Sequence, residues 1–220
     1  MAGVGDSYQL INGWSFETTY PKVMPMKSLF LHLPLLVILT SCGNHGAKDP
    51  KATGYKVRKI HYWLAKADET KVKISLWDQK AWLLNGDGKA ILETDVSTGV
   101  PGKETPEGIF PVLERIEEKR SNRYGKFVDI ETREVVVERA WEHQGAPPEG
   151  SEYEGIAMPY WMRLTWYGIG IHVGKFNKRA RASFGCVRVV DEAQEKIYQK
   201  TMLGTKVEVL ADSLQSLHGL

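Results

Sequence analysis

The sequence contains only two cysteines, Cys42 and Cys186, among its 220 residues. A fold held together by several disulfides is therefore excluded, and at most one disulfide can form. The charges nearly cancel, because 29 Lys and Arg stand against 27 Asp and Glu, a formal net charge of +2. Nucleic-acid-binding domains usually carry a strongly basic face, so this balance argues against nucleic acid as a partner. Hydrophobic residues still make up 42% of the chain, enough for a sizeable core.

The chain also lacks an apolar run as long as a membrane-spanning helix requires, which is roughly 20 residues. The apolar stretch SLFLHLPLLVILTS covers about 14 residues, 28–41, and carries no charged side chain. Lys27 stands directly before it and small residues follow, which is the order found in a secretory signal peptide. We therefore interpret residues 1–41 as a signal-peptide region and expect an exported protein. A buried core helix is the alternative interpretation.

Residues 1–23 do not fit this scheme, because a signal peptide normally begins near the initiator methionine. We interpret them as a mis-started extension and expect translation to begin at Met24 or Met26. After the apolar stretch, residues 42–70 include Gly43–Thr53, whose sequence GNHGAKDPKAT is typical of a tether. The segment Lys56–Asp68 fits a short helix or an extended lead-in equally well.

From Lys71 onward the pattern is typical of β-strands. Val72, Ile74 and Leu76 alternate with more polar residues, which predicts a half-buried strand. The turn sequence Asn85-Gly86-Asp87-Gly88 predicts a hairpin. Further segments are expected as strands at Ala81–Leu84, Ala90–Thr94, Ile109–Leu113, Glu134–Arg139 and Lys206–Leu210, and as loops at Ser97–Gly108 and, lying over a cleft, Ala146–Gly155.

One helix is well marked near the end of the chain. Asp191, with Gln194 three residues later, has the spacing of a capping box, and Gly204 is expected to stop the helix. Because strands dominate, we expect a fold that is mainly β with short helices (α+β). It forms one mostly antiparallel domain over residues 71–211, followed by a tail at 212–220.

A histidine stands in the segment TWYGIGIHV, Thr165–Val173, which we expect to be a strand. Strand alternation places His172 on the face that carries Gly168 and Gly170, opposite the apolar face. Glycines leave open space beside a side chain, as a strand that lines a cleft requires. A histidine with a purely structural role is an equally good interpretation of this pattern alone.

The second candidate is Cys186, which directly follows Gly185. Glycine permits the close approach and unusual dihedral angles by which backbone N–H groups can point at a reacting carbonyl oxygen. A thiol near a histidine can attack as a thiolate. The alternative is a buried, inert cysteine. An exported protein enters an oxidising environment, in which a free thiol without a function is a disadvantage. This favours a functional role for Cys186.

These residues resemble the catalytic motif of the L,D-transpeptidase (YkuD-like) family, in which His-x-Gly precedes Ser-His-Gly-Cys, an apolar residue and Arg or Asn. Here His172-Val173-Gly174 precedes Ser183-Phe184-Gly185-Cys186-Val187-Arg188, and the cysteine falls 14 positions after the histidine. Three upstream segments also resemble the family, namely MPYWMRLT at 158–165, VSTG at 96–99 and TPEG at 105–108. The resemblance covers residues 71–211 and implies an L,D-transpeptidase-like β-sandwich catalytic domain.

The resemblance implies a cysteine-dependent enzyme that acts on peptidoglycan stem peptides. Cys186 would attack the carbonyl between an L-centre and the following D-residue, and His172 would take the thiol proton and return it to the leaving amine. The carbonyl of Val173 would orient the imidazole, and N–H groups at Gly185 and Cys186 would form the oxyanion hole. The implied substrate-binding residues are Arg188, Tyr160 and Ser183. No metal or organic cofactor is implied, and the scattered histidines give no zinc-ligand pairs.

The sequence Leu39-Thr40-Ser41-Cys42 resembles the lipobox of bacterial lipoproteins. That resemblance implies cleavage before Cys42 and lipidation of its sulfur, which would hold the protein to a membrane in the cell envelope, on its periplasmic side. An ordinary signal peptide with a chance cysteine is the alternative interpretation.

Phe184 departs from the family pattern, which usually has histidine at this position. Phenylalanine cannot hydrogen-bond, so the polarity of the site differs while Cys186 and His172 are kept. Three functions are compatible with this pattern. They are a transpeptidase that joins stems to one another or to an acceptor wall protein, an L,D-carboxypeptidase or peptidoglycan hydrolase with the same site, and a non-catalytic wall-binding lipoprotein.

Overall fold

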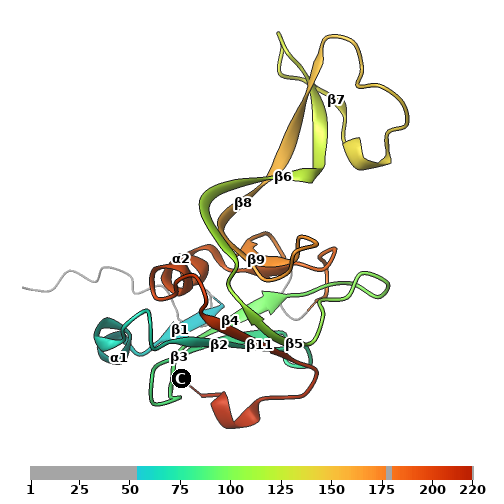
Figure 1. The fold of residues 1–220 in the computed structure, drawn as a ribbon. Helices are drawn as coiled ribbons and strands as arrows, with labels where there is room; N and C mark the ends of the chain where they lie inside the picture. The colour runs from blue at the N-terminus through green and yellow to red at the C-terminus, as the bar shows by residue number, and fades with distance from the viewer. Residues whose placement is uncertain (1–53, 177–179, 220) are drawn as a thin grey trace, which may run out of the picture. The chain divides into compact units, whose positions relative to one another are not determined.

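A computed structural model describes residues 54–176 and 180–219. They belong to the second of the two units into which the chain divides, residues 46–220. The signal-peptide region, Cys42 and the tether Gly43–Thr53 lie outside the described residues. The elements, shown in Figure 1, are β1 (Tyr55–Val57), α1 (Lys59–Leu64), β2 (Lys71–Ser75), β3 (Lys80–Leu84), β4 (Ala90–Ser97), β5 (Gly108–Pro111), β6 (Glu114–Asp129), β7 (Val135–Val137), η1 (Ala140–Glu142), β8 (Ser151–Arg163), β9 (Gly170–Val173), β10 (Val187–Val189), α2 (Asp191–Gln199), β11 (Lys206–Leu210) and η2 (Gln215–Leu217).

The strands pair in the order β5-β11-β2-β3-β4-β10-β9-β8-β6-β7, and β1 pairs with β4. Most neighbours are antiparallel, whereas β10 with β9 and β11 with β2 are parallel. The fold class expected from the sequence, mainly β with short helices, is confirmed. Within the described ranges no helix is long and apolar enough to cross a bilayer.

One apolar cluster holds the two halves of this strand order together. Strand β4 pairs with β1 and β3 through its first residues and with β10 through Val96 and Ser97. Buried side chains from β2, β3 and β11 therefore share one core with side chains from β8, β9 and β10. Both halves of the sheet thus bury one face against the same interior, as in a sandwich.

The first strands match the sequence prediction closely. Val72 and Ile74 are buried on β2, and the turn after Leu84 closes the β3–β4 hairpin with a hydrogen bond from Gly88 N–H to the Asn85 carbonyl. Both interpretations of residues 56–68 are partly right, because β1 is an extended segment and α1 a short helix. The closing strand at Lys206–Leu210 is confirmed.

The longest feature, the β6–β8 hairpin, was not expected. Strand β6 covers 16 residues and pairs with β8 from Glu114↔Arg163 to Asp129↔Ser151. The predicted loop Ala146–Gly155 is therefore wrong in its second half, because Ser151–Gly155 belongs to β8. This outer part is a ribbon with many solvated side chains on both faces, so its sequence shows no clear alternation. Figure 1 shows the ribbon running from the rest of the domain toward β7.

The predicted capping box on α2 is also wrong. The helix begins at Asp191, Val190 is the N-cap residue, and no side chain caps it. Gln194 is fully buried and donates from Nε2 to the carbonyl of Tyr160 at 2.7 Å, so it is unavailable for the helix end. The helix ends at Gln199, before the expected stop at Gly204, which stands in the turn that leads to β11.

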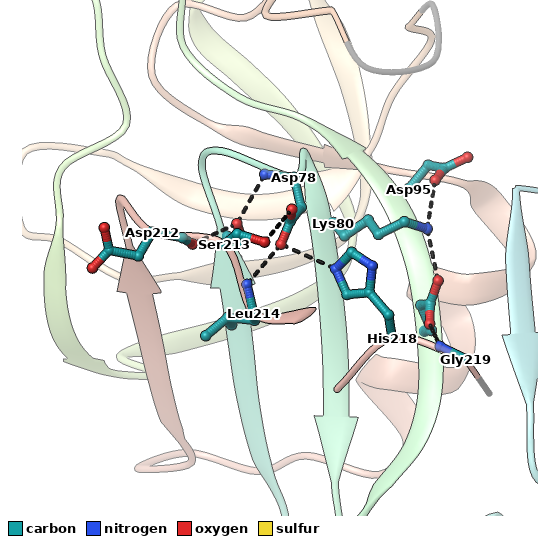
Figure 2. Close-up of polar contacts among 10 residues, drawn as sticks. Asp78, Lys80, Asp95, Asp212, Ser213, Leu214, His218 and Gly219 are labelled. Atoms are coloured by element: carbon teal, nitrogen blue, oxygen red, sulfur yellow. Dashed lines mark hydrogen bonds and ion pairs between the residues drawn. The ribbon is translucent and has the colours of Figure 1, made fainter. Parts of the chain in front are cut away.

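The C-terminal segment 212–219 is fastened to the outside of the β2–β4 region. Figure 2 shows the Asp78 carboxylate accepting hydrogen bonds from Ser213 Oγ and Leu214 N–H, both at 2.8 Å, and lying 3.1 Å from His218 Nε2. The His218 ring stacks on Trp82 with centroids 5.3 Å apart. Leu214 and Leu217 complete a small apolar cluster with Trp82, Leu84 and Ala90.

Candidate active site

The pairing of β9 with β10 decides which side chains meet. In this parallel register Val187 lies opposite Ile171, and Arg188 lies opposite His172. Ile171 and Val187 are buried in the main core, so the next residue on each strand points to the other face. Cys186 directly precedes β10 and, by the same alternation, shares the face of Arg188. Cys186, His172 and Arg188 all line one cavity.

Strand β9 is shorter than the sequence predicts. The first part of the expected strand is a turn, in which Ile169 N–H donates to Thr165 Oγ1 at 3.0 Å. Trp166 and Tyr167 in this turn are 83% and 72% exposed, so Tyr167 does not share a buried face with Ile171. Only Gly170–Val173 keeps the predicted alternation, which is the part that carries His172.

The His172 imidazole is almost completely enclosed. It is 6% exposed, and burial lowers its pKa to about 4, with a smaller lowering effect from the charge of Arg188. Nδ1 lies 2.6 Å from the carbonyl oxygen of Val173, and this hydrogen bond acts to raise the pKa of His172. With Nδ1–H donating to this carbonyl, the ring is neutral near pH 7 and Nε2 is left as the proton acceptor.

Trp161 of β8 holds the imidazole from one side. Its ring centroid lies 5.9 Å from that of His172, and its Nε1–H donates to Glu114 Oε2 at 2.8 Å. A Cβ on Gly170 would lie 2.6 Å from the Trp161 ring and from the Met162 carbonyl oxygen. The expectation that Gly170 leaves open space beside His172 is therefore wrong, because Trp161 fills that space.

The turn that carries Cys186 is fixed by hydrogen bonds from two hydroxyl groups. Ser183 Oγ donates to the Cys186 carbonyl at 2.5 Å and accepts from Gly185 N–H at 3.2 Å. Thr105 Oγ1 donates to the Gly185 carbonyl at 2.8 Å and accepts from Gly99 N–H at 3.0 Å. Gly185 has a φ of +111°, a conformation that L side chains rarely adopt. The upstream segments 96–99 and 105–108 thus support this turn.

The Cys186 thiol is a free thiol. Burial raises its pKa, while an N–H from Gly170 and the charge of Arg188 act in the opposite direction. Arg188 is itself partly buried, and its Nη1 donates to the Lys175 carbonyl at 3.4 Å. The thiol lies 3.8 Å from the Gly168 carbonyl oxygen and lines the same cavity as the His172 ring. A neutral thiol and a neutral imidazole with a free nitrogen in one cavity can react with the histidine as a general base.

The cavity has a volume of about 650 Å³. One wall comes from β9 and the segment around Cys186, and the other comes from the β6–β8 hairpin and its connection. The lining residues are Ser121, Tyr124, Arg139, Trp141, Glu142, Ile156, Ala157, Met158, Pro159, His172, Val173, Gly174, Lys175, Ser183, Phe184, Cys186 and Arg188. The loop 146–150 is not among them, so the segment over the cleft is η1 with Arg139 instead.

Three aromatic rings join the two walls. The Phe184 centroid lies 5.2 Å from that of Tyr124 on β6 and 6.4 Å from that of Trp141 in η1, and Tyr124 lies 5.5 Å from Trp141. Lys103 places its Nζ 4.0 Å from the centre of the Phe184 ring. Phe184 is 40% exposed and stands at the rim of the cavity as part of a hydrophobic contact between its walls.

Two of the predicted substrate-binding residues use their side chains in contacts within the fold. The Tyr160 ring lies 5.5 Å from that of Tyr198 on α2, and Tyr160 is not among the lining residues. Ser183 lines the cavity but is 1% exposed, and its hydroxyl is used inside the turn. Sequence reasoning missed Trp161, Tyr124 and Trp141 as site residues, and only the segment 158–165, which contains Trp161, gave a signal.

A metal site is not formed by the described residues, since among 54–176 and 180–219 no three His, Cys, Asp or Glu side chains are grouped to hold an ion. The cavity lining carries three cations, Arg139, Lys175 and Arg188, and a single carboxylate, Glu142. The site can therefore attract an anionic group toward the thiol and imidazole.

The fold and site define a mainly β domain with a cysteine and a histidine on one face of a cleft. The model of the L,D-transpeptidase catalytic domain family, YkuD, matches residues 69–209. The chain therefore belongs to this family. Comparison with curated protein sequences gave no match.

Solved structures with a similar fold are L,D-transpeptidases. An L,D-transpeptidase from Mycobacterium smegmatis is 18% identical with a TM-score of 0.50, and the match covers 65% of this chain and 59% of that one. One from Stackebrandtia nassauensis is 20% identical, with a TM-score of 0.48 and coverage of 68% and 59%. The Enterococcus faecium enzyme, as a C442S mutant, is 23% identical, with a TM-score of 0.45 and coverage of 64% and 50%. This chain thus spans little more than half the length of these proteins.

Proposed function

We propose that this protein is a peptidoglycan L,D-transpeptidase that works through an acyl-enzyme on Cys186. The observation that carries the proposal is the β9–β10 register, which brings Cys186 and His172 onto one face of the cavity. The family match supports stem peptides of peptidoglycan as the substrate.

The reaction needs two proton transfers by His172. In acylation, Nε2 takes the thiol proton as Sγ attacks the stem carbonyl carbon, and the imidazolium then protonates the leaving amine of the D-residue. A thioester to the L-centre remains. In the second half, an acceptor amine gives a proton to Nε2 and attacks the thioester, which forms the new amide and restores the thiol. Water as acceptor would give hydrolysis.

The oxyanion that forms in each half needs a backbone donor. Ser183 Oγ already accepts from Gly185 N–H, so we assign the main contact to Cys186 N–H. Ser183 and Thr105 are positioning residues in this scheme, because they hold the turn in which that N–H stands. Val173 has a similar role toward the imidazole.

Recognition of the stem is assigned to the charge and shape of the cleft. Arg188, whose charge acts on Cys186, and Lys175 line the cavity on the β9–β10 side, and Arg139 lines it from the segment before η1. Stem peptides carry carboxylates, which these cations can bind. Met158 and Pro159 supply an apolar floor for the peptide backbone.

We further propose that the protein is exported and held in the cell envelope by lipid on Cys42, as its lipobox-like sequence indicates. Mass spectrometry of the protein isolated from its host membrane tests this proposal. A mature chain that begins at an acylated Cys42 is expected, and the mass of an unmodified N-terminus at any other residue would contradict it.

The catalytic proposal is tested by incubating the purified protein with muropeptides that carry tetrapeptide stems and identifying the products by mass. Crosslinked dimers are expected from the native chain and from Cys42→Ala, the matched control with the other cysteine changed. Cys186→Ala is expected to form no dimer and no thioester adduct.

Other products would identify the alternative functions. Shortened stems without dimers would show a carboxypeptidase that uses the same thioester. Turnover that survives Cys186→Ala would overturn the nucleophile assignment. Absence of any product, with wall binding unaffected by that substitution, would indicate a wall-binding protein.

A further inference from the structure

Helix α1 presents its apolar side to solvent. Ile60, Trp63 and Leu64 have the i, i+3, i+4 spacing of one helix face, and they are 73%, 77% and 62% exposed. In a globular domain such a face is normally buried against the core. A large exposed apolar patch of this kind usually marks a contact surface.

The exposure is a fixed property of the helix and not fraying of a loose end. Tyr62 packs against the main core from the opposite side, and its hydroxyl donates to the Lys196 carbonyl at 3.0 Å. Lys200 Nζ donates to the Trp63 carbonyl at 3.3 Å and to the Ala65 carbonyl at 2.8 Å, which holds the C-terminal end of α1. The domain therefore orients the apolar face outward.

The chain segment that carries this face is mostly positive. Residues 46–66 contain six Lys and Arg and one Asp, and Lys56 and Lys59 are exposed beside the helix. The acidic groups nearest along the chain are Asp68 and Glu69, and Glu69 is paired with Lys66 at 3.1 Å. On the neighbouring α2, Glu192 is bound to the Tyr55 hydroxyl, and Glu195 lies close enough to Tyr62 to add to the effect of burial in raising the pKa of the Tyr62 hydroxyl.

From these observations we propose that α1 docks on an anionic lipid surface, with Ile60, Trp63 and Leu64 entering the interfacial region and the basic residues contacting headgroups. Tryptophan with aliphatic neighbours and a basic rim is the composition of interfacial helices. Three side chains are too few for a stable protein–protein interface, which buries about 1,200–2,000 Å². They suffice for a contact that adds to the lipid anchor proposed at Cys42, on which this inference rests.

The position of the helix in the chain supports a lipid surface as the partner of α1. Lys59 stands 17 positions after Cys42, so even a fully extended connection reaches no more than roughly 60 Å. A domain held that close to a bilayer meets the lipid at a high effective concentration, and a weak contact is then populated. Figure 1 shows α1 well apart from the β7 end of the β6–β8 ribbon, so the ribbon stays clear of the docked surface.

The test uses the full chain reconstituted into phospholipid vesicles, with a photoreactive amino acid placed at Leu64. The matched control carries the same group at Ile109, an aliphatic residue of β5 that is 65% exposed. With phosphatidylglycerol in the vesicles, lipid crosslinks at position 64 are expected to exceed those at position 109 by about tenfold. Replacing Arg58 and Lys59 by Glu is expected to remove most of this excess.

Equal lipid crosslinking at the two positions would overturn the proposal, and so would a crosslinked protein dimer or an excess that does not depend on anionic lipid. Muropeptide turnover in detergent is measured on the same variants. It is expected to stay unchanged, which keeps this outcome separate from the proposed catalytic function.

Discussion

At the scale of single residues, burial controls the protonation of the two side chains proposed to react. It lowers the pKa of His172 to about 4 and raises the pKa of Cys186. Both changes favour the uncharged form, so the resting site holds a thiol and a neutral imidazole and not a thiolate–imidazolium pair. In the proposed mechanism, charge separates only when a substrate carbonyl is attacked.

The raised pKa of Cys186 predicts how alkylation of this thiol depends on pH. The rate at which iodoacetamide modifies Cys186 is expected to keep rising with pH beyond about 8.5, the pKa of an ordinary cysteine, because only the thiolate reacts. Mass spectrometry of the modified peptide gives the rate, and denatured protein is the control. A plateau between pH 5 and pH 7 would show a preformed ion pair and contradict the expected charge state.

The protonation of His172 also predicts how stability depends on pH. Its folded pKa lies below the value of about 6.5 for an unfolded histidine, so the unfolded chain binds the extra proton first. Stability is complete above pH 6.5 and falls as the pH drops toward 4, by roughly 3 kcal/mol for this group. Urea unfolding of the native protein and His172→Asn at both pH values measures this loss. An equal loss in the variant would assign it to other groups.

At the scale of elements, β9 and the β6–β8 hairpin build the two walls of the site. Four residues of β9 place His172 between the core and the cavity, with Trp161 of β8 packed against it. The hairpin then returns over the cleft through Tyr124 and Trp141, which meet Phe184. Catalytic geometry and cleft shape therefore depend on different contacts.

The packing at β9 predicts the effect of one added methyl group. Gly170→Ala is expected to lower stability by about 1–3 kcal/mol, because its Cβ would overlap the Trp161 ring and a backbone oxygen. Activity should fall with it as His172 shifts. Gly86→Ala is the control, since its Cβ would lie 3.2 Å from the Glu69 carboxylate, which can move. Thermal unfolding followed by circular dichroism compares the two, and equal losses would contradict this packing argument.

The aromatic contact predicts a kinetic effect without loss of the nucleophile. Trp141→Ala removes one side of the cleft, so the KM for stem peptides is expected to rise about tenfold, roughly 1.4 kcal/mol, while kcat changes little. Trp77→Ala, at a tryptophan that is 76% exposed and outside the cavity lining, is the control. A fall in kcat with unchanged KM would mean that Trp141 acts on the chemical step.

At the scale of the whole molecule, the sequence predicted what depends on local pattern. The hairpin at Asn85–Gly88 and the buried strand at Val72 and Ile74 follow from turn chemistry and alternation, and both are present. The sequence of the outer β6–β8 ribbon shows no alternation of apolar and polar residues that could predict its strands. Gln194 does not cap the helix because its side chain is buried and donates to a backbone carbonyl 34 residues away.

Contacts between residues that are distant in the sequence also limit what can be predicted about the site. Cys186 and His172 stand out in the sequence because Cys186 directly follows a glycine and His172 has a glycine two positions away on each side, both in a recognisable motif. Tyr124 and Trp141 reach the cavity only because a long hairpin folds back over it, and no local signal marks such a contact. Tyr160 was predicted from a motif whose backbone has a φ of +53° at that position, and its ring lies on Tyr198 instead.

The C-terminal segment gives a prediction at this scale. Asp78 holds Ser213 and Leu214, and these hydrogen bonds outweigh burial and lower its pKa, so the contact persists until the pH falls below its ordinary value of about 3.9. Asp78→Ala is expected to speed amide exchange of 212–219 by at least tenfold and to lower stability by about 1–3 kcal/mol. Asp87→Ala, in an exposed turn, is the control. Unchanged exchange in Asp78→Ala would show that Leu214 and Leu217 alone hold the segment.

The parallel pairing of β9 with β10 also bears on how related sequences are recognised. The separation of His172 and Cys186 in space is set by the register of two strands and by the hydrogen-bonded turn at Ser183–Cys186, while part of the 13 residues between them along the chain only has to connect these two segments. Insertions there change the loop and leave the pair in place, since the cost of a longer loop grows slowly with its length. A search pattern with a fixed gap would therefore overlook distant relatives that keep the same arrangement of the two side chains.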